Sequence, residues 1–286
     1  MARITVGIPV YNGAKTLRAV LDCLRAQSFD DFEVIVSDNG STDGSQNIVA
    51  EVARLDSRFK LLVQSENIGA KNNFLELARI AQSEFFVWRA DDDLCDRDFL
   101  ATLLSRFDSS PQLALVAPKV IFVHDDGSRN YEEAFEIPLT GARSTRIGRS
   151  LIGASPSWIF GLWRRSDLLS ALDATVPTYP YVWGWDPLAL FPVLIEERVA
   201  SETSATLIKH TVSTARYRWR VPAREMWEMR RAFRRTCFRI FNARNWTIFE
   251  KIALTIYVLR FANLRVYRFW KTVRAYVRQL RGVPQS

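Results

Sequence analysis

Three consecutive carboxylates, Asp91-Asp92-Asp93, come two residues after a short apolar run at residues 85–88 of this 286-residue sequence. Like charges so close together repel one another unless water or a cation offsets the repulsion. Carboxylate oxygens are the hard ligands that Mg²⁺ and Mn²⁺ prefer. Because alternate residues of an extended backbone point the same way, Asp91 and Asp93 can face one ion together. A metal site is therefore one interpretation of the triplet, and a solvated acidic turn is the other.

Apolar runs that are typical of buried strands occur three times in the first third of the chain, each followed by a polar segment. They cover residues 3–9, 32–37 and 85–88, and segments with a helical spacing of apolar residues separate them. Strands that alternate with helices indicate βαβ units and a largely parallel sheet. In such a sheet, ligands bind at the carboxyl ends of the strands. We therefore predict a Rossmann-like α/β fold, with a mostly parallel central sheet flanked by helices.

The polar segments after these strands resemble those of one enzyme family. They read Ile8-Pro9-Val10-Tyr11-Asn12, Val36-Ser37-Asp38-Asn39-Gly40-Ser41-Thr42-Asp43-Gly44 and Ala90-Asp91-Asp92-Asp93. As a set they resemble the family-two nucleotide-sugar glycosyltransferases, over residues 3–215 or so. The resemblance implies the A-type glycosyltransferase fold and a nucleotide diphosphate sugar as donor, with a UDP-linked sugar expected first. It also implies Mg²⁺ or Mn²⁺ as cofactor.

The first two segments would bind the nucleotide. By resemblance, Pro9, Tyr11 and Asn12 shape the pocket, with Tyr11 against the base, although a simple turn is the alternative. Asp38 would accept hydrogen bonds from the base edge, which a carboxylate does well through charge assistance. A helix-capping aspartate is the alternative role for Asp38. Many relatives have a second acid where this chain has Asn39, which leaves the identity of the base open.

The turn at residues 67–71 supplies further candidates for the donor site. Asn67, Gly69 and Lys71 stand where a turn leads into a helix. Gly69 permits close approach of the backbone, and Lys71 could reach a phosphate. An ordinary helix cap and a solvated lysine explain the same residues.

The metal ligands depend on how the triplet is aligned with the family. Relatives often show Asp-x-Asp before a further acid, and in that alignment Arg89 replaces the first Asp and Asp91 is the metal ligand. Aligned on the triplet itself, Asp91 and Asp93 form the pair, and we expect Asp91 and Asp92 to line the donor site. Some relatives use a histidine at the place of His210 against the diphosphate or metal, whereas a lone histidine is more often structural.

Asp186 is the candidate general base. In relatives, an acid before a Leu-rich helix takes the proton from the acceptor hydroxyl, in an inverting single displacement. Trp183 and Trp185 could stack on a sugar face and, by partly desolvating Asp186, raise its pKa toward a useful value. Relatives often have Glu-Asp where this chain has Trp185-Asp186, and a plain N-cap ahead of Pro187 is the alternative role.

The basic residues gather toward the end of the chain. Residues 222–286 contain fifteen Arg and Lys against three Glu, a net charge of +12, whereas the whole chain carries +8. One predicted helix face there holds Arg268, Lys271, Arg274, Arg278 and Arg281. This pattern is typical of a helix that lies on an anionic membrane surface. A helix packed on the catalytic body and a subunit contact are the alternatives, and we expect no nucleic-acid partner because no recognised module accompanies the charge.

The cysteine spacing and the length of the apolar runs indicate in which cellular compartment the protein works. The three cysteines are far apart in the sequence, which argues against a disulfide framework and a zinc site and fits a reducing cytosol. We see no signal peptide and no run near the roughly 20 apolar residues of a membrane span. We therefore expect a cytoplasmic protein, peripheral at the inner face of the membrane.

Together these observations favour a metal-dependent enzyme with a basic appendage. We expect a catalytic domain at 1–221, with a nucleotide-binding part at 1–125 and an acceptor-side part at 126–221, and a basic helical tail at 222–286. The expected reaction moves one sugar to a hydroxyl of a glycan or lipid-linked glycan in surface-polysaccharide assembly. The alternatives are a sugar-nucleotide nucleotidyltransferase, which would show a Gly-rich phosphate loop near the first strand, and a non-catalytic membrane-associated binding protein. An oligomer is left open.

Overall fold

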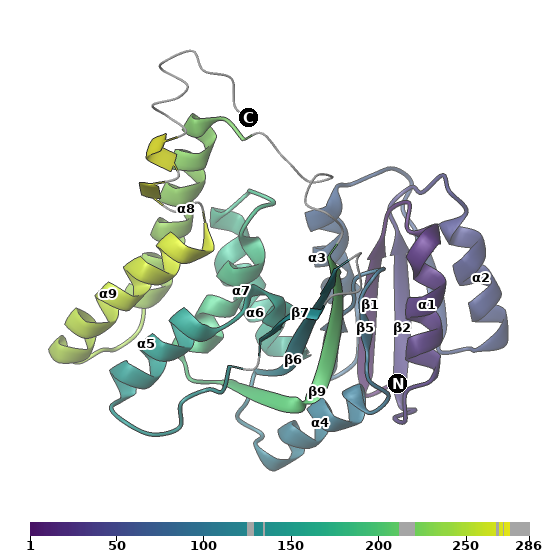
Figure 1. Cartoon of the computed structure of the whole chain (residues 1–286), viewed down its shortest axis with the longest axis horizontal. Helices are drawn as coiled ribbons and strands as arrows, with labels where there is room; N and C mark the ends of the chain where they lie inside the picture. The colour runs from purple at the N-terminus through teal and green to yellow at the C-terminus, as the bar shows by residue number, and fades with distance from the viewer. Residues whose placement is uncertain (125–128, 134, 212–220, 267–268, 271, 275–286) are drawn as a thin grey trace. The chain divides into compact units, whose positions relative to one another are not determined.

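The computed structural model describes residues 1–124, 129–133, 135–211, 221–266, 269–270 and 272–274. Strands and helices alternate through residues 4–88, as the sequence predicts (Figure 1). The chain forms two compact units, and each combines segments that are far apart in the sequence. The first unit consists of Met1–Glu136, Ser157–Leu169 and Val199–Ser213, and the second of Ile137–Pro156, Ser170–Arg198 and Thr214–Ser286.

A sheet of nine strands, counted over the described residues, forms the middle of the first unit. Its order is β3-β2-β1-β4-β8-β6-β9-β5, with β7 paired to β6. The neighbours from β3 to β4 are parallel, as are β6 and β9, whereas β8 runs antiparallel to β4 and β6. The bounds are β1 Ile4–Val10, β2 Phe32–Asp38, β3 Phe59–Val63, β4 Phe85–Trp88, β5 Leu94–Cys95, β6 Leu115–His124, β7 Arg129–Glu133, β8 Leu162–Arg164 and β9 Val199–Thr211.

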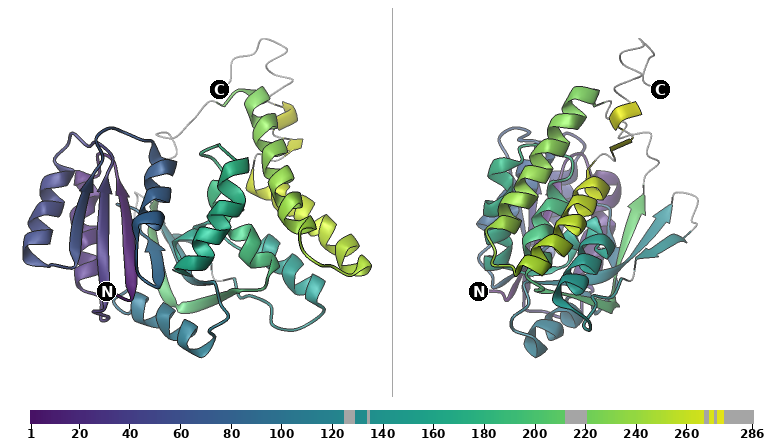
Figure 2. Two further views of the ribbon diagram at one scale, coloured as in Figure 1. Left: turned by 180° about the vertical axis from the view of Figure 1, so that it is seen from behind. Right: turned by 90° about the vertical axis from the view of Figure 1, so that its left-hand side faces the viewer.

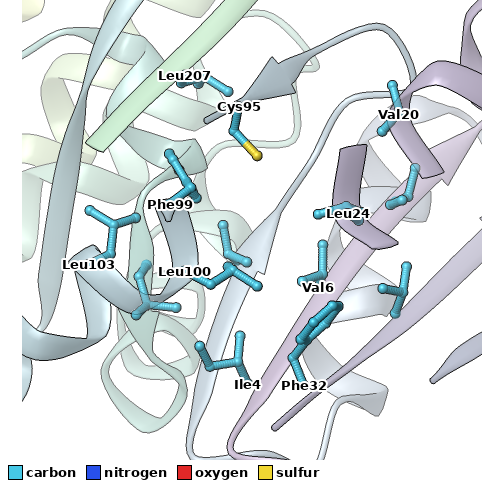
Figure 3. Packing of buried hydrophobic residues seen from close by; sticks show 14 of the residues in the cluster. Ile4, Val6, Val20, Leu24, Phe32, Cys95, Phe99, Leu100, Leu103 and Leu207 are labelled. Carbon is cyan, nitrogen blue, oxygen red and sulfur yellow. The ribbon is translucent and has the colours of Figure 1, made fainter. Parts of the chain in front are cut away.

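Both faces of this sheet are covered by helices. Those of the first unit are α1 Ala14–Arg25, α2 Ser45–Leu55, α3 Ala70–Ile80 and α4 Phe99–Ser109. Ile4, Val6 and Ile8 point to one face and are fully buried, in a cluster with side chains from α1 and α4 (Figure 3). On the other face Gly7 makes room for α3, because a Cβ there would lie 3.1 Å from the Cβ of Leu77. Each such buried aliphatic side chain stabilises the fold by roughly 1.5–3 kcal/mol. The predicted α/β fold with its flanked central sheet is confirmed.

The second unit is helical in the part that the structure describes. Its helices are α5 Arg143–Gly153, the end of α6 (Arg165–Thr175), α7 Trp185–Ile195, α8 Ala223–Asn242 and α9 Ile248–Arg265. Every residue of α7 from Pro187 onward is buried. The ring of Phe191 in α7 lies 5.4 Å from that of Phe261 in α9, and Phe233 in α8 lies 5.8 Å from the same ring. Apolar packing around α7 therefore holds the C-terminal helices in this unit.

The C-terminal basic segment is helical over most of its described length. The helices α8 and α9 pack side by side (Figure 2). A capping box in which Thr247 and Glu250 exchange hydrogen bonds begins α9. Of the predicted basic face, Arg274 is exposed, whereas Arg268, Lys271, Arg278 and Arg281 lie outside the described residues. Among the described helices, none combines the length and the hydropathy needed to cross a membrane.

Candidate functional site

The loops after β1 and β2 are joined by hydrogen bonds at the carboxyl end of the sheet. The amide of Asn12 donates to Oγ of Ser41 at 2.8 Å, and the amide of Thr42 donates to Oδ1 of Asn12 at 2.9 Å. Asn12 has a φ of 54°, a left-handed conformation that asparagine tolerates better than most residues. Pro9 is buried within β1. The side chain of Tyr11 is 53% exposed, so its ring is accessible to a ligand.

Asp38 lies at the end of β2 with one carboxylate oxygen satisfied and the other not. Its Oδ1 accepts hydrogen bonds from the amide of Ser41 at 3.0 Å and from Nε2 of Gln46 at 2.9 Å. The residue is 1% exposed, and its Oδ2 is buried without a hydrogen-bond partner among the described residues. Leaving a buried acceptor unsatisfied costs about 1–3 kcal/mol. An N–H donor of a ligand would remove that penalty, as the edge of a nucleotide base does.

The turn before α3 is ordered by side-chain amides. Nδ2 of Asn39 donates to Oδ1 of Asn67 at 2.9 Å, and the amide of Gly69 donates to the same oxygen at 2.9 Å. Gly69 has a φ of 82°, which favours glycine. Lys71 is almost fully buried in α3, and burial lowers the pKa of its ammonium to about 8. Asn67 and Asn39 thus shape the turn, and Lys71 is the member of this group that carries charge.

The acidic triplet is crowded and partly buried. Burial raises the pKa of the Asp91 carboxyl to about 6, with further contributions from Asp92, Asp93 and Asp43. Burial and then Asp93 also raise the pKa of Asp92, against the opposing charges of Lys209 and His210. His210 is exposed at the end of β9. The structure therefore brings His210 within electrostatic range of Asp92, although the two residues are 118 positions apart in the sequence.

Asp93 is neutralised within the protein. It is 1% exposed, and its Oδ2 forms an ion pair with Nζ of Lys209 from β9. The same Nζ lies 4.0 Å from the centroid of the Phe160 ring, which adds a cation–π contact. Of the three carboxylates, Asp91 and Asp92 are therefore the ones whose charge a bound cation would offset most.

The donor atoms at the triplet fit a hard divalent cation that is shared with a substrate. Within the described ranges, no three His, Cys, Asp or Glu side chains are grouped so that they alone could hold a metal. Mg²⁺ is usually bound by one or two carboxylates together with phosphates of the substrate, and not by an all-protein cage. Burial, and after it the neighbouring carboxylates, raise the pKa values of Asp91 and Asp92, so a cation bound here would favour their ionised forms. The residues present therefore fit Mg²⁺ or Mn²⁺ bound together with a diphosphate.

Asp186 belongs to the second unit, where it lies half-buried in the first turn of α7. Gly184, with a φ of 86°, occupies the N-cap position, so Asp186 is not the capping residue. An acid in the first turn is nevertheless favoured by the helix dipole. The side chain of Trp183 is 60% exposed, and its backbone oxygen accepts a hydrogen bond from Oη of Tyr179 at 2.5 Å.

Two residues that the sequence analysis did not select are important to the site. The first is Gly13, which directly precedes α1 and lies against the Asp91 carboxylate. A side chain on Gly13 would clash with that carboxylate. The second is Lys209, the partner of Asp93. A signal for Gly13 was its position directly after Asn12 in the first loop. For Lys209 the only signal was its position beside His210.

Comparisons with known proteins show what the chain is similar to. The model of "Glycosyl transferase family 2" matches residues 5–167, more than half of the chain. The chain is 32% identical to the abequosyltransferase RfbV of Salmonella typhimurium over 197 residues, 63% of this chain and 59% of that protein. It is 32% identical to the GalNAc(5)-diNAcBac-PP-undecaprenol beta-1,3-glucosyltransferase of Campylobacter jejuni over 111 residues, 37% of this chain and 35% of that protein. The chain thus spans less than two thirds of the length of either relative.

Solved structures with the same fold include two complexes with sugar nucleotides. The structure of S. aureus TarS 1–349 with UDP-GlcNAc has a TM-score of 0.70 and 19% identity, and the match covers 99% of this chain and 82% of that one. The mannosyltransferase PcManGT from Pyrobaculum calidifontis, in complex with GDP-Man and Mn²⁺, has a TM-score of 0.62 and 16% identity, covering 99% of this chain and 76% of that one. At these identities the likeness shows the fold alone.

Proposed function

The chain belongs to glycosyl transferase family 2, and on that premise we propose that it moves one sugar from a nucleotide diphosphate sugar to a hydroxyl of a glycan or lipid-linked glycan. The proposed donor is a UDP-linked sugar, and the proposed process is surface-polysaccharide assembly. The observation that carries the proposal is the buried, unsatisfied Oδ2 of Asp38 at the same sheet edge as the acidic triplet. The unsatisfied oxygen of Asp38 suits a nucleotide base, and the acidic triplet with a cation suits a diphosphate. Strand β1 lies between β2, which ends at Asp38, and β4, which precedes the triplet.

The proposed donor site uses residues of all the loops at this edge. The base lies between the accessible ring of Tyr11 and the Asp38 carboxylate, whose Oδ2 accepts an N–H of the base. Asn12 and Pro9 hold the first loop in place, while Gly69 and Asn67 shape the turn next to it. The largely buried Lys71 would gain favourable charge interactions from a nearby phosphate, which would raise its pKa from about 8.

The cation would be held by Asp91 and Asp92, with His210 as a further candidate ligand. When bound there, Mg²⁺ or Mn²⁺ neutralises charge on the departing nucleoside diphosphate. Asp93 was expected to face the same ion, and its ion pair with Lys209 supports a positioning role in which it holds β9 against the triplet. This arrangement would keep His210 near Asp92.

Asp186 is the proposed general base for an inverting single displacement. Asp186 is half-buried in the first turn of α7. It would take the proton of the acceptor hydroxyl as that oxygen attacks the anomeric carbon. The exposed ring of Trp183 offers a flat apolar surface for a sugar face.

The acceptor and the place of action are proposed from the second unit. On α9, Leu254, Val258 and Phe261 are buried, whereas a second apolar row is exposed on the other side. That row consists of Ile248, Phe249, Ile252, Ile256 and Leu259. The exposed cations Lys251 and Arg260 lie on the same helix. An apolar row beside cations fits an anionic membrane surface, and it supports a lipid-linked acceptor and a peripheral location at the inner face of the membrane.

Release of nucleoside diphosphate from a panel of nucleotide sugars tests the function. With Mn²⁺ present, we expect the full chain to release the nucleoside diphosphate from one donor, and faster when a lipid-linked glycan is added. Asp91→Asn should weaken donor binding and lose turnover. Asp186→Asn should keep donor binding and lose turnover by roughly 10²–10⁴-fold. Asp22→Asn, at an exposed position of α1, is the matched control and should behave as wild type. If no donor in the panel binds or reacts, the proposal is wrong.

A further inference from the structure

Two cysteines that are 72 residues apart in the sequence contact each other close to the acidic triplet. Sγ of Cys23, in α1, lies 3.7 Å from Sγ of Cys95, in β5. The amide of Cys95 donates to Sγ of Cys23 at 3.4 Å, and Nε2 of Gln27 lies 3.6 Å from Sγ of Cys95. Neither cysteine is in a disulfide. The two sulfur atoms are thus in van der Waals contact, and Sγ of Cys23 also contacts the backbone of Cys95.

A buried cation lies close to this pair. Arg89 is 1% exposed, and none of its three guanidinium nitrogens has a hydrogen-bond partner among the described residues. Its guanidinium carbon lies 4.5 Å from the centroid of the Phe99 ring, which offsets only part of the charge. A buried cation of this kind favours a nearby anion. The thiolate of Cys23 is an anion that the chain itself can supply.

Electrostatics support a thiolate at Cys23. Hydrogen bonds from the side chain and backbone of Cys95, together with a smaller effect of the Arg89 charge, lower the pKa of the Cys23 thiol to about 6, against the effect of burial. A thiolate is the form of cysteine that attacks oxidants and electrophiles. Cys23 is partly exposed, whereas Cys95 is buried, so Cys23 is the member of the pair that a small oxidant would meet first.

We propose that Cys23 and Cys95 form a redox-active pair that a peroxide converts into an intrachain disulfide. The Cys23 thiolate attacks one peroxide oxygen; the O–O bond breaks, and the leaving hydroxide takes up a proton to become water. The Cys23 sulfenic acid is then attacked by the sulfur of Cys95, which forms the S–S bond and expels the sulfenic oxygen, with the Cys95 proton, as a second water. Two thiols and one hydrogen peroxide thus give one disulfide and two waters.

The geometry requires a small movement. A disulfide has an S–S distance of about 2.05 Å. The distance between the two sulfur atoms must therefore shorten by less than the diameter of a sulfur atom. Cys95 is the last residue of β5 and lies two residues after Asp93, and α1 starts directly after Gly13, which lies against Asp91. The bond would therefore join the two elements that border the acidic triplet.

Intact mass and peptide mapping test the proposal. The full chain is reduced, transferred to buffer without thiol, and treated with hydrogen peroxide at low protein concentration. We expect wild type to lose about two mass units per chain, to show a linked Cys23–Cys95 peptide pair, and to return to the starting mass with dithiothreitol. Cys23→Ser should show no loss. Cys95→Ser should instead accumulate a Cys23 sulfenic acid that dimedone traps.

Cys237→Ser is the matched control, because Cys237 is fully buried in α8 of the second unit. It should form the same disulfide at the wild-type rate. Arg89→Met should slow the reaction of Cys23 several-fold without changing the linked peptides. The proposal is overturned if wild type keeps three reduced thiols, if the bond joins two chains, or if Cys23→Ser still loses two mass units.

Discussion

The backbone of Gly13 lies so close to Asp91 that a Cβ on Gly13 would overlap Oδ2 of Asp91 and lie 3.1 Å from its Cγ. The first loop and the acidic triplet are therefore in direct contact at the carboxyl end of the sheet. This contact positions one carboxylate of the triplet beside the loop that carries Tyr11 and Asn12. It also explains why a residue without a side chain precedes α1.

Gly13→Ala should disturb this contact. We expect a loss of about 1–3 kcal/mol in the free energy of unfolding, as for other overpacking substitutions, together with weaker donor binding. Chemical denaturation of Gly13→Ala, Asp91→Ala and the double variant measures the coupling between the two residues. In the Asp91→Ala background the alanine at position 13 should cost much less. An equal cost in both backgrounds would contradict the contact.

Asp91→Asn should stabilise the protein in a pH-dependent way when no metal is present. Because burial raises the pKa of Asp91 in the folded state from 3.8 to about 6, the folded state binds more protons than the unfolded state between these values. Ionisation of Asp91 therefore lowers stability as the pH rises from about 4 to 6, and the full penalty persists above that range. Thermal unfolding should show Asp91→Asn to be more stable by about 1–2 kcal/mol at pH 7.5, with a difference that shrinks toward zero near pH 4. A constant difference across this range would show that ionisation is not the cause.

Asp38→Asn tests the base-binding role. Replacing the carboxylate weakens a charge-assisted hydrogen bond to the base, so the Kd of the preferred nucleoside diphosphate should rise by roughly 10–100-fold. The preference among UDP, GDP and CDP should also narrow, because the lost bond is to the base. Titration calorimetry with all three nucleotides measures both effects. Asp22→Asn serves as the control, and an unchanged order and strength of binding in Asp38→Asn would argue for a purely structural Asp38.

The exposed row of α9 should bind anionic lipid. Ile252→Glu with Ile256→Glu places two charges in that row and should reduce flotation with phosphatidylglycerol vesicles while leaving nucleotide binding unchanged. Leu55→Glu is a matched control on α2, because Leu55 is also exposed, at 72%. Added salt should weaken flotation too, since each nearby Lys or Arg contributes about 1 kcal/mol. Equal flotation of the α9 variant and the control would rule out this surface.

The sequence was informative wherever local patterns determine structure. Apolar runs and the polar segments after them predicted the parallel strands β1, β2 and β4 and the edge where Asp38 and Asp91 lie. Contacts across long stretches of chain were not predictable. The pairing of Asp93 with Lys209 depends on β9 returning beside β5 and β6, and no local pattern encodes that return. The same holds for the meeting of Cys23 and Cys95, whose wide spacing in the sequence suggested three unrelated thiols.

The helix that carries Asp186 shows a second reason why sequence patterns do not predict every position. A polar residue before an apolar helix suggests an N-cap, yet Gly184 takes that position because its φ of 86° suits the turn that enters α7. Side-chain propensity alone ranks aspartate above glycine at an N-cap. Backbone geometry decided the position, and Asp186 instead lies in the first turn of the helix.

Binding of UDP measured with and without Mn²⁺ tests the central claim most directly. Titration calorimetry on wild type, Asp91→Ala and the control Asp22→Ala gives the coupling between nucleotide and metal, which must be reciprocal. We predict that Mn²⁺ tightens UDP binding at least roughly tenfold, about 1.4 kcal/mol, in wild type and in the control. The coupling should vanish in Asp91→Ala, which should still bind UDP weakly through Asp38. Equal UDP affinity with and without Mn²⁺ in wild type, or full coupling in Asp91→Ala, would contradict a metal-assisted donor site at the acidic triplet.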